Sequence, residues 1–327
     1  MQDNSARMNP TQTSDAPLIS VALCVHDGAR YLREQLDSVL AQRDVALEVV
    51  VLDDASSDDS PALLRDCTAR DVRIRCFRND TNLGPTRSFE RAMSLARGAF
   101  IAPCDQDDVW EPEKLSRLLA AIGDADLAYC DSAYIDASGA LAGTRVSGDI
   151  EMLAGHEPLT FLFANSVSGH AALLRREVFE AARPFPEGAF HDWWLALCAA
   201  ARAGVVYLPE PLVRFRRHTD AFSTLGRDRK DRRPSSRYRA WIEQRRAIMA
   251  AHAHSGLRGH ADAQRVLRAL DTAAGRRGSG ELLRALWHMR PVLPGDSSAG
   301  INALRWWFRF RRKLRRARGE PEPQSRP

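Results

Sequence analysis

Three carboxylates fall within four residues at the end of a short apolar run, in the segment Ala99-Phe-Ile-Ala-Pro-Cys-Asp-Gln-Asp-Asp-Val-Trp110. Such a run predicts a buried strand, and ligands of open α/β sheets bind at the carboxyl ends of strands. Anions this close repel one another unless a positive charge lies between them. The segment therefore favours a hard divalent cation, Mg²⁺ or Mn²⁺, which carboxylates and phosphates bind together. The alternative is a solvated loop in which Asp108 caps a helix that begins at Val109.

A second acidic pair, Asp53-Asp54, ends another apolar run, Leu47-Glu-Val-Val-Val-Leu52. Strand and helix patterns alternate up to this point and beyond it, which predicts a doubly wound sheet of parallel strands with right-handed connections. The carboxyl ends of parallel strands lie at one edge. We therefore expect Asp53, Asp54, Asp105 and Asp107 to gather there.

The elements that must position these residues follow from periodicity and turn signals. The expected strands are 18–25, 47–52, 72–77 and the run before Asp105, and the expected helices between and after them are 31–42, 87–96 and 113–122. Further on we expect a strand at 127–130, a hairpin near 136–139, a loop over 141–154, a strand ending at Leu174 and a helix over 176–182. A helix opening at 190–198, a strand at 205–208 and an extended segment at 212–218 complete this part.

Composition separates the chain into two parts. Residues 1–210 hold 19 basic against 32 acidic side chains, a net charge of −13, whereas residues 211–327 hold 28 against 10, a net charge of +18. The six cysteines form no C-x-x-C pair, which indicates reduced core residues. No apolar run of 18 residues and no signal-peptide pattern is present, so we expect a cytoplasmic protein, with peripheral attachment at the inner face of the plasma membrane as an option.

The basic part reads as helices at 236–252, 260–274, 281–289 and 303–318, separated by joints rich in Arg, Gly and Ser. We therefore expect four regions. These are a disordered N-terminus at 1–17, a catalytic domain at 18–220, a basic helical extension at 221–318 and a disordered Pro-rich tail at 319–327.

Several ordered motifs resemble the inverting family 2 glycosyltransferases of the GT-A fold, and within them the rhamnosyltransferase-like members that build bacterial surface polysaccharides. The resemblance covers roughly residues 18–218. It rests on Val21-Ala-Leu-Cys-Val-His-Asp-Gly-Ala-Arg-Tyr-Leu32, Val51-Leu-Asp-Asp-Ala-Ser-Ser-Asp58, Asn82-Leu-Gly84, Cys104-Asp-Gln-Asp-Asp-Val-Trp110, Ser168-Gly-His170, His191-Asp-Trp-Trp194 and Arg216-Arg-His218. The implied fold is a GT-A mixed sheet, doubly wound, with a C-terminal helical appendage.

The resemblance implies a role for each matching residue. Asp53 or Asp54 would accept a hydrogen bond from the imide N–H of uracil or thymine, with an Asx-turn or helix cap as the alternative. Asp105 and Asp107 would hold the metal, and Asp108 would be structural. The implied contacts to the nucleotide sugar are Val25, Asp53, Asp54, Asn82, Gly84, Asp105, Gln106, Arg216 and His218.

The implied reaction is an inverting transfer of a hexose or deoxyhexose, with rhamnose favoured, from a UDP- or dTDP-sugar to a glycan hydroxyl, in O-antigen or capsule-like synthesis. Asp192 would be the general base, which takes the proton of the acceptor hydroxyl. His191, Trp193 and Trp194 would contact the acceptor. The alternative for Asp192 is a helix cap, and the alternative for Arg216 and His218 is an exposed basic strand end.

The segment 305–318 holds eight cations, four aromatic residues and no anion. This mixture suits an anionic membrane surface, which a lipid-linked acceptor would make useful. The alternatives are a solvated basic helix packed on the domain and nucleic-acid binding, for which no recognised motif is present. We therefore expect no nucleic-acid partner.

Two rival functions remain open from the sequence. Asp105-x-Asp107-x-Val109 also matches the nucleophile strand of haloacid dehalogenase-like phosphatases, although in that class the Asp-Asp motif comes later in the chain. A non-catalytic protein that binds a nucleotide sugar is the other rival. It predicts that Asp192 can be replaced without consequence.

Overall fold

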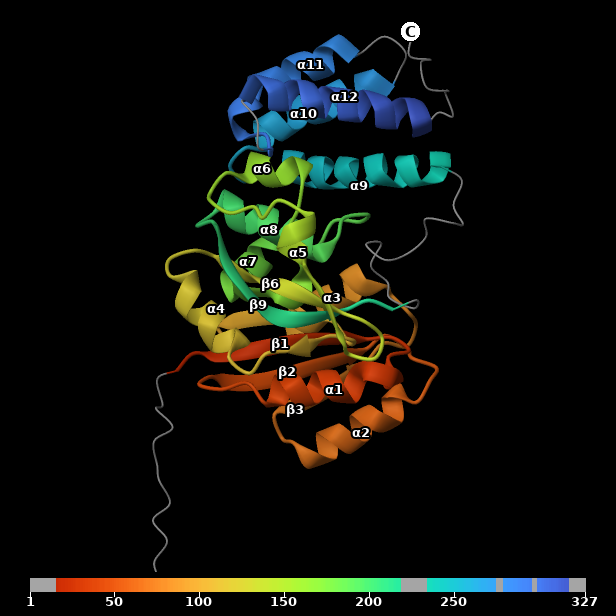
Figure 1. Cartoon of the computed structure of the whole chain (residues 1–327), viewed down its shortest axis with the longest axis vertical. Helices are drawn as coiled ribbons and strands as arrows, with labels where there is room; N and C mark the ends of the chain where they lie inside the picture. Colours follow the sequence, from red (N-terminus) through yellow and green to blue (C-terminus); the bar gives the residue numbers. More distant parts are fainter. Residues whose placement is uncertain (1–15, 219–233, 275–278, 296–298, 318–327) are drawn as a thin grey trace, which may run out of the picture.

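The computed structural model describes residues 16–218, 234–274, 279–295 and 299–317. The expected disorder of residues 1–17 and 319–327 therefore falls almost wholly outside the described residues. Figure 1 shows the sheet with α1 and α2 on one side and the C-terminal helices stacked at the opposite end of the molecule, beyond α6 and α8. No helix among the described residues is long and apolar enough to cross a membrane.

The first half of the sheet is parallel, as the alternating pattern predicts. Its strands are β1 (Leu18–Val25), β2 (Ala46–Asp53), β3 (Ile74–Arg78) and β4 (Phe100–Cys104). The helices that connect them are α1 (Ala29–Leu40), α2 (Ser60–Arg70) and α3 (Pro85–Leu95). Val25 at the end of β1 pairs with Asp53 at the end of β2. The loops that follow these strands therefore meet at one edge of the sheet.

The second half makes the sheet mixed, in the order β3-β2-β1-β4-β8-β6-β9-β5, with β7 paired to β6. Its strands are β5 (Val109–Trp110), β6 (Leu127–Ile135), β7 (Leu141–Arg145), β8 (Ala172–Arg175) and β9 (Val205–Arg216). β8 is antiparallel to both of its neighbours, β4 and β6, whereas β6 and β9 are parallel. The two short extended segments expected at 205–208 and 212–218 form one strand, β9.

One local prediction and one alternative are wrong. The stretch 141–154, expected to be a loop, contains β7 and a short helix, α5 (Val146–Asp149), because Asp131 accepts hydrogen bonds from the backbone and hydroxyl of Ser147 and so holds the chain against β6. Asp108 caps no helix, because Val109 and Trp110 pair antiparallel with β9 and the next helix starts at Lys114.

The remaining helices cover the faces of the sheet and extend beyond it. Those of the first 218 residues are α4 (Lys114–Ile122), α6 (Pro158–Phe163), the 3₁₀ turn η1 (Gly169–Ala171), α7 (Arg176–Ala182) and α8 (His191–Ala201). The C-terminal ones are α9 (Pro234–His254), α10 (His260–Ala274), α11 (Ser279–His288), the 3₁₀ turn η2 (Arg290–Val292) and α12 (Ala299–Ala317).

The C-terminal helices share a core with the sheet. One apolar cluster runs from β2 and β4 through α8 and α6 to α9, α10 and α12. The ring of Phe163 on α6 lies 5.4 Å from Trp306 and 6.2 Å from Phe310, both on α12. α8 is buried from Trp193 to Ala201 because it lies between the sheet and this helical layer, which explains why its sequence is apolar on every side.

Candidate active site

The acidic loop is fixed at both ends by the sheet. β4, which precedes Asp105, is buried along its whole length, and β5, which follows Asp108, pairs with β9. Arg216 at the end of β9 donates its backbone N–H to Asp108 Oδ1 over 3.0 Å. The loop therefore has little freedom, and the direction of each of its three carboxylates is fixed.

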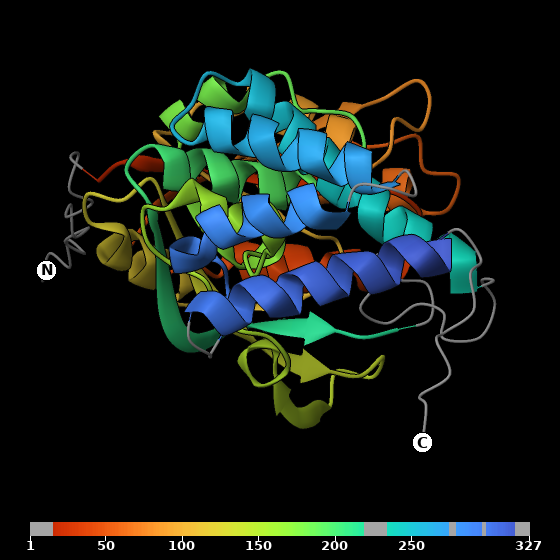
Figure 2. The same ribbon diagram turned by 90° about the horizontal axis from the view of Figure 1, so that it is seen from above.

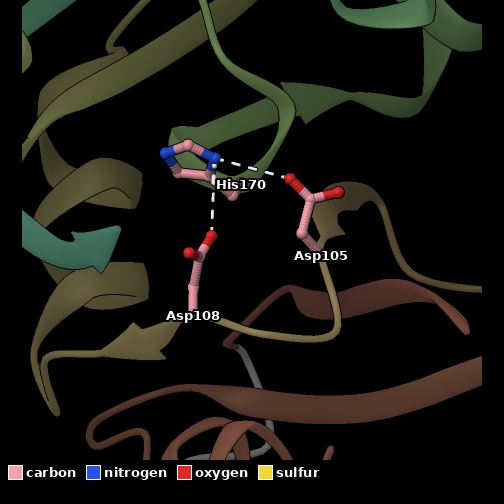
Figure 3. A group of neighbouring side chains, drawn as sticks. All are labelled: Asp105, Asp108 and His170. Atoms are coloured by element: carbon pink, nitrogen blue, oxygen red, sulfur yellow. Dashed lines mark ion pairs between the residues drawn. The ribbon is translucent and has the colours of Figure 1, made fainter. Parts of the chain in front are cut away.

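Two of these carboxylates converge on a histidine from η1. Figure 3 shows Asp105 and Asp108 reaching from one loop toward the ring of His170, whose Nδ1 lies 3.5 Å from Asp105 Oδ2 and 3.5 Å from Asp108 Oδ2. One donor atom from each of the three residues lies within 4.8 Å of the others. Two carboxylates and an imidazole are a donor set that suits a divalent cation.

Asp108 and His170 are buried, and their charges depend on each other. Burial, together with the neighbouring carboxylates, raises the pKa of Asp108 to about 7. Its Oδ2 is buried and has no hydrogen-bond partner among the described residues. Burial opposes protonation of His170, but Asp108 and Asp105 outweigh it and raise the pKa of His170. A proton or a cation between these groups therefore stabilises the cluster.

A buried lysine lies behind the cluster. The Lys114 side chain is fully buried, its Nζ donates to the backbone carbonyl of His170 over 2.5 Å, and it lies 3.0 Å from the ring centroid of Trp110. Burial lowers the pKa of Lys114 to about 8, although Asp108 and Asp105 act in the opposite direction. Lys114 thus places a positive charge in the core beneath the acidic loop.

Asp107 points away from this cluster, toward the end of β9. Its Oδ2 lies 2.7 Å from His218 Nε2, and His218 Nδ1 is buried without a partner among the described residues. Burial and the nearby Asp105 raise the pKa of Asp107. The predicted metal pair Asp105 and Asp107 is therefore divided between two imidazoles, with Asp105 facing His170 and Asp107 facing His218.

Arg216 is not free to bind a diphosphate, contrary to the prediction from the sequence. Its side chain is 2% exposed, its Nε donates to the backbone carbonyl of Asp107 over 2.8 Å, and its Nη2 pairs with Glu34 Oε2 at 2.7 Å. Its guanidinium also stacks 4.6 Å from the ring centroid of Tyr31. Arg216 therefore joins the acidic loop to α1.

The loops after β1 and β4 are also joined by a side chain that was expected to bind the donor. Gln106 Oε1 accepts from the backbone N–H of His26 over 2.8 Å, and its Nε2 donates to the carbonyl of the same residue over 3.1 Å. Both ends of the Gln106 amide are thus occupied. Val25, directly before His26, is buried and contributes main chain to this edge.

Asp53 and Asp54 hold the neighbouring loops, and both are almost fully buried. Asp53 pairs with Arg78 and accepts from the backbone N–H of Ser56. Asp54 accepts from Asn79 Nδ2 at 2.6 Å and from the backbone N–H groups of Leu83 and Gly84 at 2.8 and 3.0 Å. Only the contact between Asp53 and Ser56 is local, as the turn alternative requires, whereas the Asp54 contacts join distant loops.

The Asn82-Leu-Gly84 turn lies beside the loop after β1. Asn82 Nδ2 is 3.0 Å from His26 Nε2, and Asn82 Oδ1 accepts from the backbone N–H of Gly84. Asp54 therefore fixes a turn that, with His26, faces the same edge as the acidic loop.

Asp192 and His191 form the first turn of α8, as predicted. Asp192 Oδ1 accepts from the backbone N–H of Trp193 at 2.6 Å, and no other hydrogen bond to its carboxylate is formed by the described residues. Burial raises the pKa of Asp192, and the charge of Asp105 adds to this rise. Burial outweighs the effect of the helix N-terminus, so Asp192 is a better base than an exposed aspartate.

His191 lies between Phe89 and Gly169. Its ring stacks on Phe89 with centroids 4.0 Å apart, and its buried Nε2 has no partner among the described residues. A Cβ at position 169 would lie 2.9 Å from this Nε2, so Ser168-Gly-His170 needs its glycine for η1 to approach α8. Burial lowers the pKa of His191.

Trp193 and Trp194, which the sequence predicts to contact the acceptor, face the core in this structure. Both indoles are buried, with Nε1 of Trp193 donating to the carbonyl of Phe161 and Nε1 of Trp194 donating to the carbonyl of Ala182. They point from α8 into the core because α6 and α7 cover them. Neither is available to stack on a sugar.

The sequence interpretation gave no role to His170, Lys114 or Glu34. His170 was visible in the Ser168-Gly-His170 motif, but nothing in its spacing connected it to the acidic loop. Lys114 lies in a helix with an amphipathic sequence pattern. A lysine in such a helix is predicted to be exposed, and only the fold shows that this one is buried.

Comparisons with known proteins agree with this geometry. Residues 20–182 match the family model of glycosyl transferase family 2. The succinoglycan biosynthesis protein ExoO of Rhizobium meliloti is 35% identical over 112 residues, which are 34% of this chain and 32% of that protein.

Solved structures share the fold across nearly the whole chain. S. aureus TarS 1–349 in complex with UDP-GlcNAc has a TM-score of 0.58 at 15% identity and covers 93% of each chain. The mannosyltransferase PcManGT of Pyrobaculum calidifontis, in complex with GDP-Man and Mn²⁺, has a TM-score of 0.55 at 15% identity and covers 94% of this chain and 87% of its own. These likenesses confirm the expected GT-A fold with C-terminal helices.

Proposed function

Because this chain belongs to glycosyltransferase family 2, we propose that it transfers a hexose or deoxyhexose from a UDP- or dTDP-sugar to a glycan hydroxyl, with inversion, in bacterial polysaccharide synthesis. The observation that carries the proposal is Asp192, a partly buried carboxylate in the first turn of α8 whose pKa is raised by burial and by the charge of Asp105 in the acidic loop. A base and a leaving-group site on facing elements are what an inverting displacement needs. Family membership leaves no support for the phosphatase alternative.

Asp192 would take the proton of the acceptor hydroxyl. One of its oxygens is oriented by the backbone N–H of Trp193, and the carboxylate accepts no other hydrogen bond from the described residues. His191, fixed on Phe89, would place the acceptor beside it. Trp193 and Trp194 contribute only by burying the first turn of α8, which keeps the pKa of Asp192 high.

A divalent cation fits the acidic loop, and we place it at Asp105 and Asp107, which would require Asp107 to turn from His218. The donor atoms that already lie within 4.8 Å of one another belong to Asp105, Asp108 and His170. Asp105 is 43% exposed and Asp107 is 16% exposed, so a cation they hold can also reach a diphosphate, whereas Asp108 is fully buried. When bound, the cation would stabilise the negative charge of the leaving diphosphate. Carboxylates with an imidazole favour Mn²⁺ over Mg²⁺, because Mg²⁺ prefers oxygen ligands alone.

The donor would bind along the edge formed by the loops after β1, β2 and β4. Exposed or partly exposed polar side chains there include His26, Asn82 and Asp105. Asp53, Asp54, Gln106 and Arg216 would act indirectly, because each holds one of these loops in place. Rhamnose as the donated sugar rests on motif resemblance alone.

A lipid-linked acceptor and an anionic membrane surface complete the proposal. Three apolar side chains form one exposed stripe of α12, Ile301, Leu304 and Phe308, and Trp287 of α11 is exposed as well. α12 holds no acidic residue. An apolar stripe among arginines suits the headgroup layer of an anionic leaflet.

The proposal is tested by thermal unfolding with UDP, dTDP, GDP or CMP, each with Mn²⁺ or with EDTA. A ligand that binds the folded state raises the melting temperature. We expect a rise with UDP or dTDP that needs Mn²⁺. No rise with any of the four nucleotides in Mn²⁺ would contradict nucleotide-sugar binding.

A further inference from the structure

A large groove lies between α12 and the sheet half of the molecule, away from the acidic loop. Its volume is about 1160 Å³. One wall is the part of α12 that carries Arg305, Arg309, Arg312 and Arg316, and the facing wall is the segment from Asp149 to Leu153 with Ala164 and Asn165. Arg245 of α9 also lines it. Figure 2, seen from above, shows α12 in dark blue running alongside the yellow-green segment that contains α5.

The groove carries a large excess of positive charge. Seven arginines line it, against two carboxylates, Asp149 and Glu151. Asp149 already accepts from the hydroxyl of Tyr134 at 3.0 Å and lies 3.9 Å from Arg217 Nη2. The lining therefore cannot neutralise its own arginines.

Three of these arginines lack an anionic partner among the described residues. The Arg309 guanidinium lies 5.0 Å from the centroid of the Trp306 ring, and within the described part of the chain neither Arg309 nor Arg312 forms a hydrogen bond or an ion pair through its guanidinium. Arg245 donates from Nε to the carbonyl of Phe163 and from Nη1 to that of Trp241, which leaves Nη2 without a partner. Burial, with Arg309 nearby, lowers the pKa of Arg245 to about 9. Unpaired guanidiniums at a partly buried site are stabilised by an anion.

We propose that this groove binds the diphosphate of a lipid-linked glycan acceptor. Guanidinium groups bind phosphate oxygens through paired hydrogen bonds, and Trp306 and Phe308 in the lining offer apolar surface for the first units of a lipid chain. The exposed stripe Ile301, Leu304 and Phe308 lies next to the arginine row on α12, so a chain leaving the groove would enter a leaflet.

The position of the groove fits an acceptor. Its wall residue Asp149 is near Arg217, which lies between Arg216 and His218 at the end of β9. Asn165 lies five residues before His170. A glycan on a diphosphate held in the groove would have to extend along the end of β9 to reach the acidic loop. This inference rests on the proposed function for the identity of the ligand, but diphosphate binding in the groove is measurable without catalysis.

The test is a titration of the full chain, in EDTA, with farnesyl diphosphate, inorganic pyrophosphate and farnesol, followed by tryptophan fluorescence. The test variant is Arg309→Ala with Arg312→Ala. The matched control is Arg268→Ala with Arg284→Ala, two exposed helical arginines outside the groove. If the double variant is unstable, Arg312→Ala alone, at an exposed position, replaces it as the test variant.

We expect farnesyl diphosphate to bind, farnesol to bind at least tenfold more weakly, and the double variant to lose at least tenfold in affinity while the control does not. Arg312→Ala alone should lose about threefold. Binding of pyrophosphate as tight as that of farnesyl diphosphate, with the same loss of affinity in the double variant, would still support a diphosphate site. That result would show that the phosphate groups alone provide the affinity.

Equal binding by the wild type and the double variant would overturn the proposal, and so would equal binding of farnesol. If the variant loses only its sedimentation with phosphatidylglycerol vesicles, the arginines serve the membrane surface and the groove proposal fails. Failure of the proposed function is distinguishable, because neither UDP nor dTDP with Mn²⁺ would then raise the melting temperature of the wild type or the variant.

Discussion

The three carboxylates of the acidic loop have different partners, and their chemistry differs accordingly. Asp105 faces His170 and is partly exposed, and Asp107 contacts His218. Asp108 is buried and accepts a hydrogen bond from the backbone N–H of Arg216. A repeated acidic motif therefore does not act as one unit. The exposed pair is suited to a cation and its substrate, and the buried member is suited to holding the loop.

This division predicts which carboxylate supports nucleotide binding. Asp107→Ala should abolish the Mn²⁺-dependent rise in melting temperature with the cognate nucleoside diphosphate, because it removes a ligand that the substrate can reach. Asp108→Asn should keep that rise, since the buried side chain still accepts from the N–H of Arg216. Thermal unfolding of both variants with Mn²⁺ and EDTA checks this. Loss of the rise in Asp108→Asn but not in Asp107→Ala would place the cation at the cluster of Asp105, Asp108 and His170.

Asp108 also predicts a pH dependence of stability. Its pKa rises on folding from 3.8 to about 7, so between pH 4 and 7 the folded state holds a proton that the unfolded chain has released. This group therefore lowers the free energy of unfolding as the pH rises through that window, by about 4 kcal/mol at most.

Asp108→Asn should remove the decrease in the free energy of unfolding that Asp108 causes as the pH rises. The variant should therefore be more stable relative to the wild type at pH 7.5 than at pH 4.5. Urea unfolding in EDTA at the two pH values measures it. Asp124→Asn, at an exposed position, is the control. A difference between Asp108→Asn and wild type that is the same at both pH values would rule out the raised pKa as the cause.

At the scale of elements, the site depends on close contact between β1 and β4. A Cβ at position 98 would lie 2.4 Å from the carbonyl oxygen of Leu18 and 2.8 Å from the backbone nitrogen of Ser20. Ser20 Oγ in turn donates to Glu48 and accepts from the backbone N–H of Gly98. The start of β1 is thus held against the start of β4 by buried polar contacts.

Gly98→Ala should therefore destabilise the protein by about 1 to 3 kcal/mol, the usual cost of forcing atoms into a closely packed region. Gly148→Ala is the matched control, because a Cβ added there would meet no other atom within 4 Å and α5 accommodates alanine. Urea unfolding of both variants measures the costs. Equal stability of Gly98→Ala and wild type would mean that the two strands separate without penalty.

The elements also show what the sequence could predict. Period-two apolar runs and helix signals located β1 to β4 and the helices between them, because these elements form largely through local patterns. The acidic loop and Asp192 were found for the same reason, since each lies at the end of a clear element. The stretch 141–154 was missed because β7 is exposed along its length and has no apolar pattern of its own.

Side-chain direction was the less predictable part of the site. Arg216 and Gln106 stood in the right motifs, but their partners Glu34 and His26 come from distant segments, and only the fold brings them together. The burial of Trp193 and Trp194 could not be predicted, because aromatic residues beside a carboxylate fit a core and a sugar site equally well in sequence.

For the whole molecule, the charge division of the sequence becomes a division in space. The acidic part forms the sheet and its loops, and the basic helices cover one end of it (Figure 1). Because the two parts share an apolar core, the arginines of α12 have a fixed position relative to the sheet. The proposed membrane contact and the proposed acceptor groove both follow from that fixed position.

The membrane contact predicts that replacing the three apolar residues of the stripe, Ile301, Leu304 and Phe308, by serine should release the protein from vesicles containing phosphatidylglycerol. These side chains are exposed, so the folded structure should persist. The control is Val72→Ser with Leu141→Ser, exposed apolar residues of the sheet half. Co-sedimentation is the measurement, and unchanged sedimentation of the triple variant would contradict the contact.

The central claim is that Asp192 is the base of a glycosyl transfer, and donor turnover by Asp192→Asn tests it most directly. The measurement is release of nucleoside diphosphate from the cognate nucleotide sugar in Mn²⁺, with thermal unfolding to verify nucleotide binding. We predict unchanged binding and a rate at least about 100-fold lower than that of the wild type. Equal rates of release by the variant and the wild type would contradict the claim.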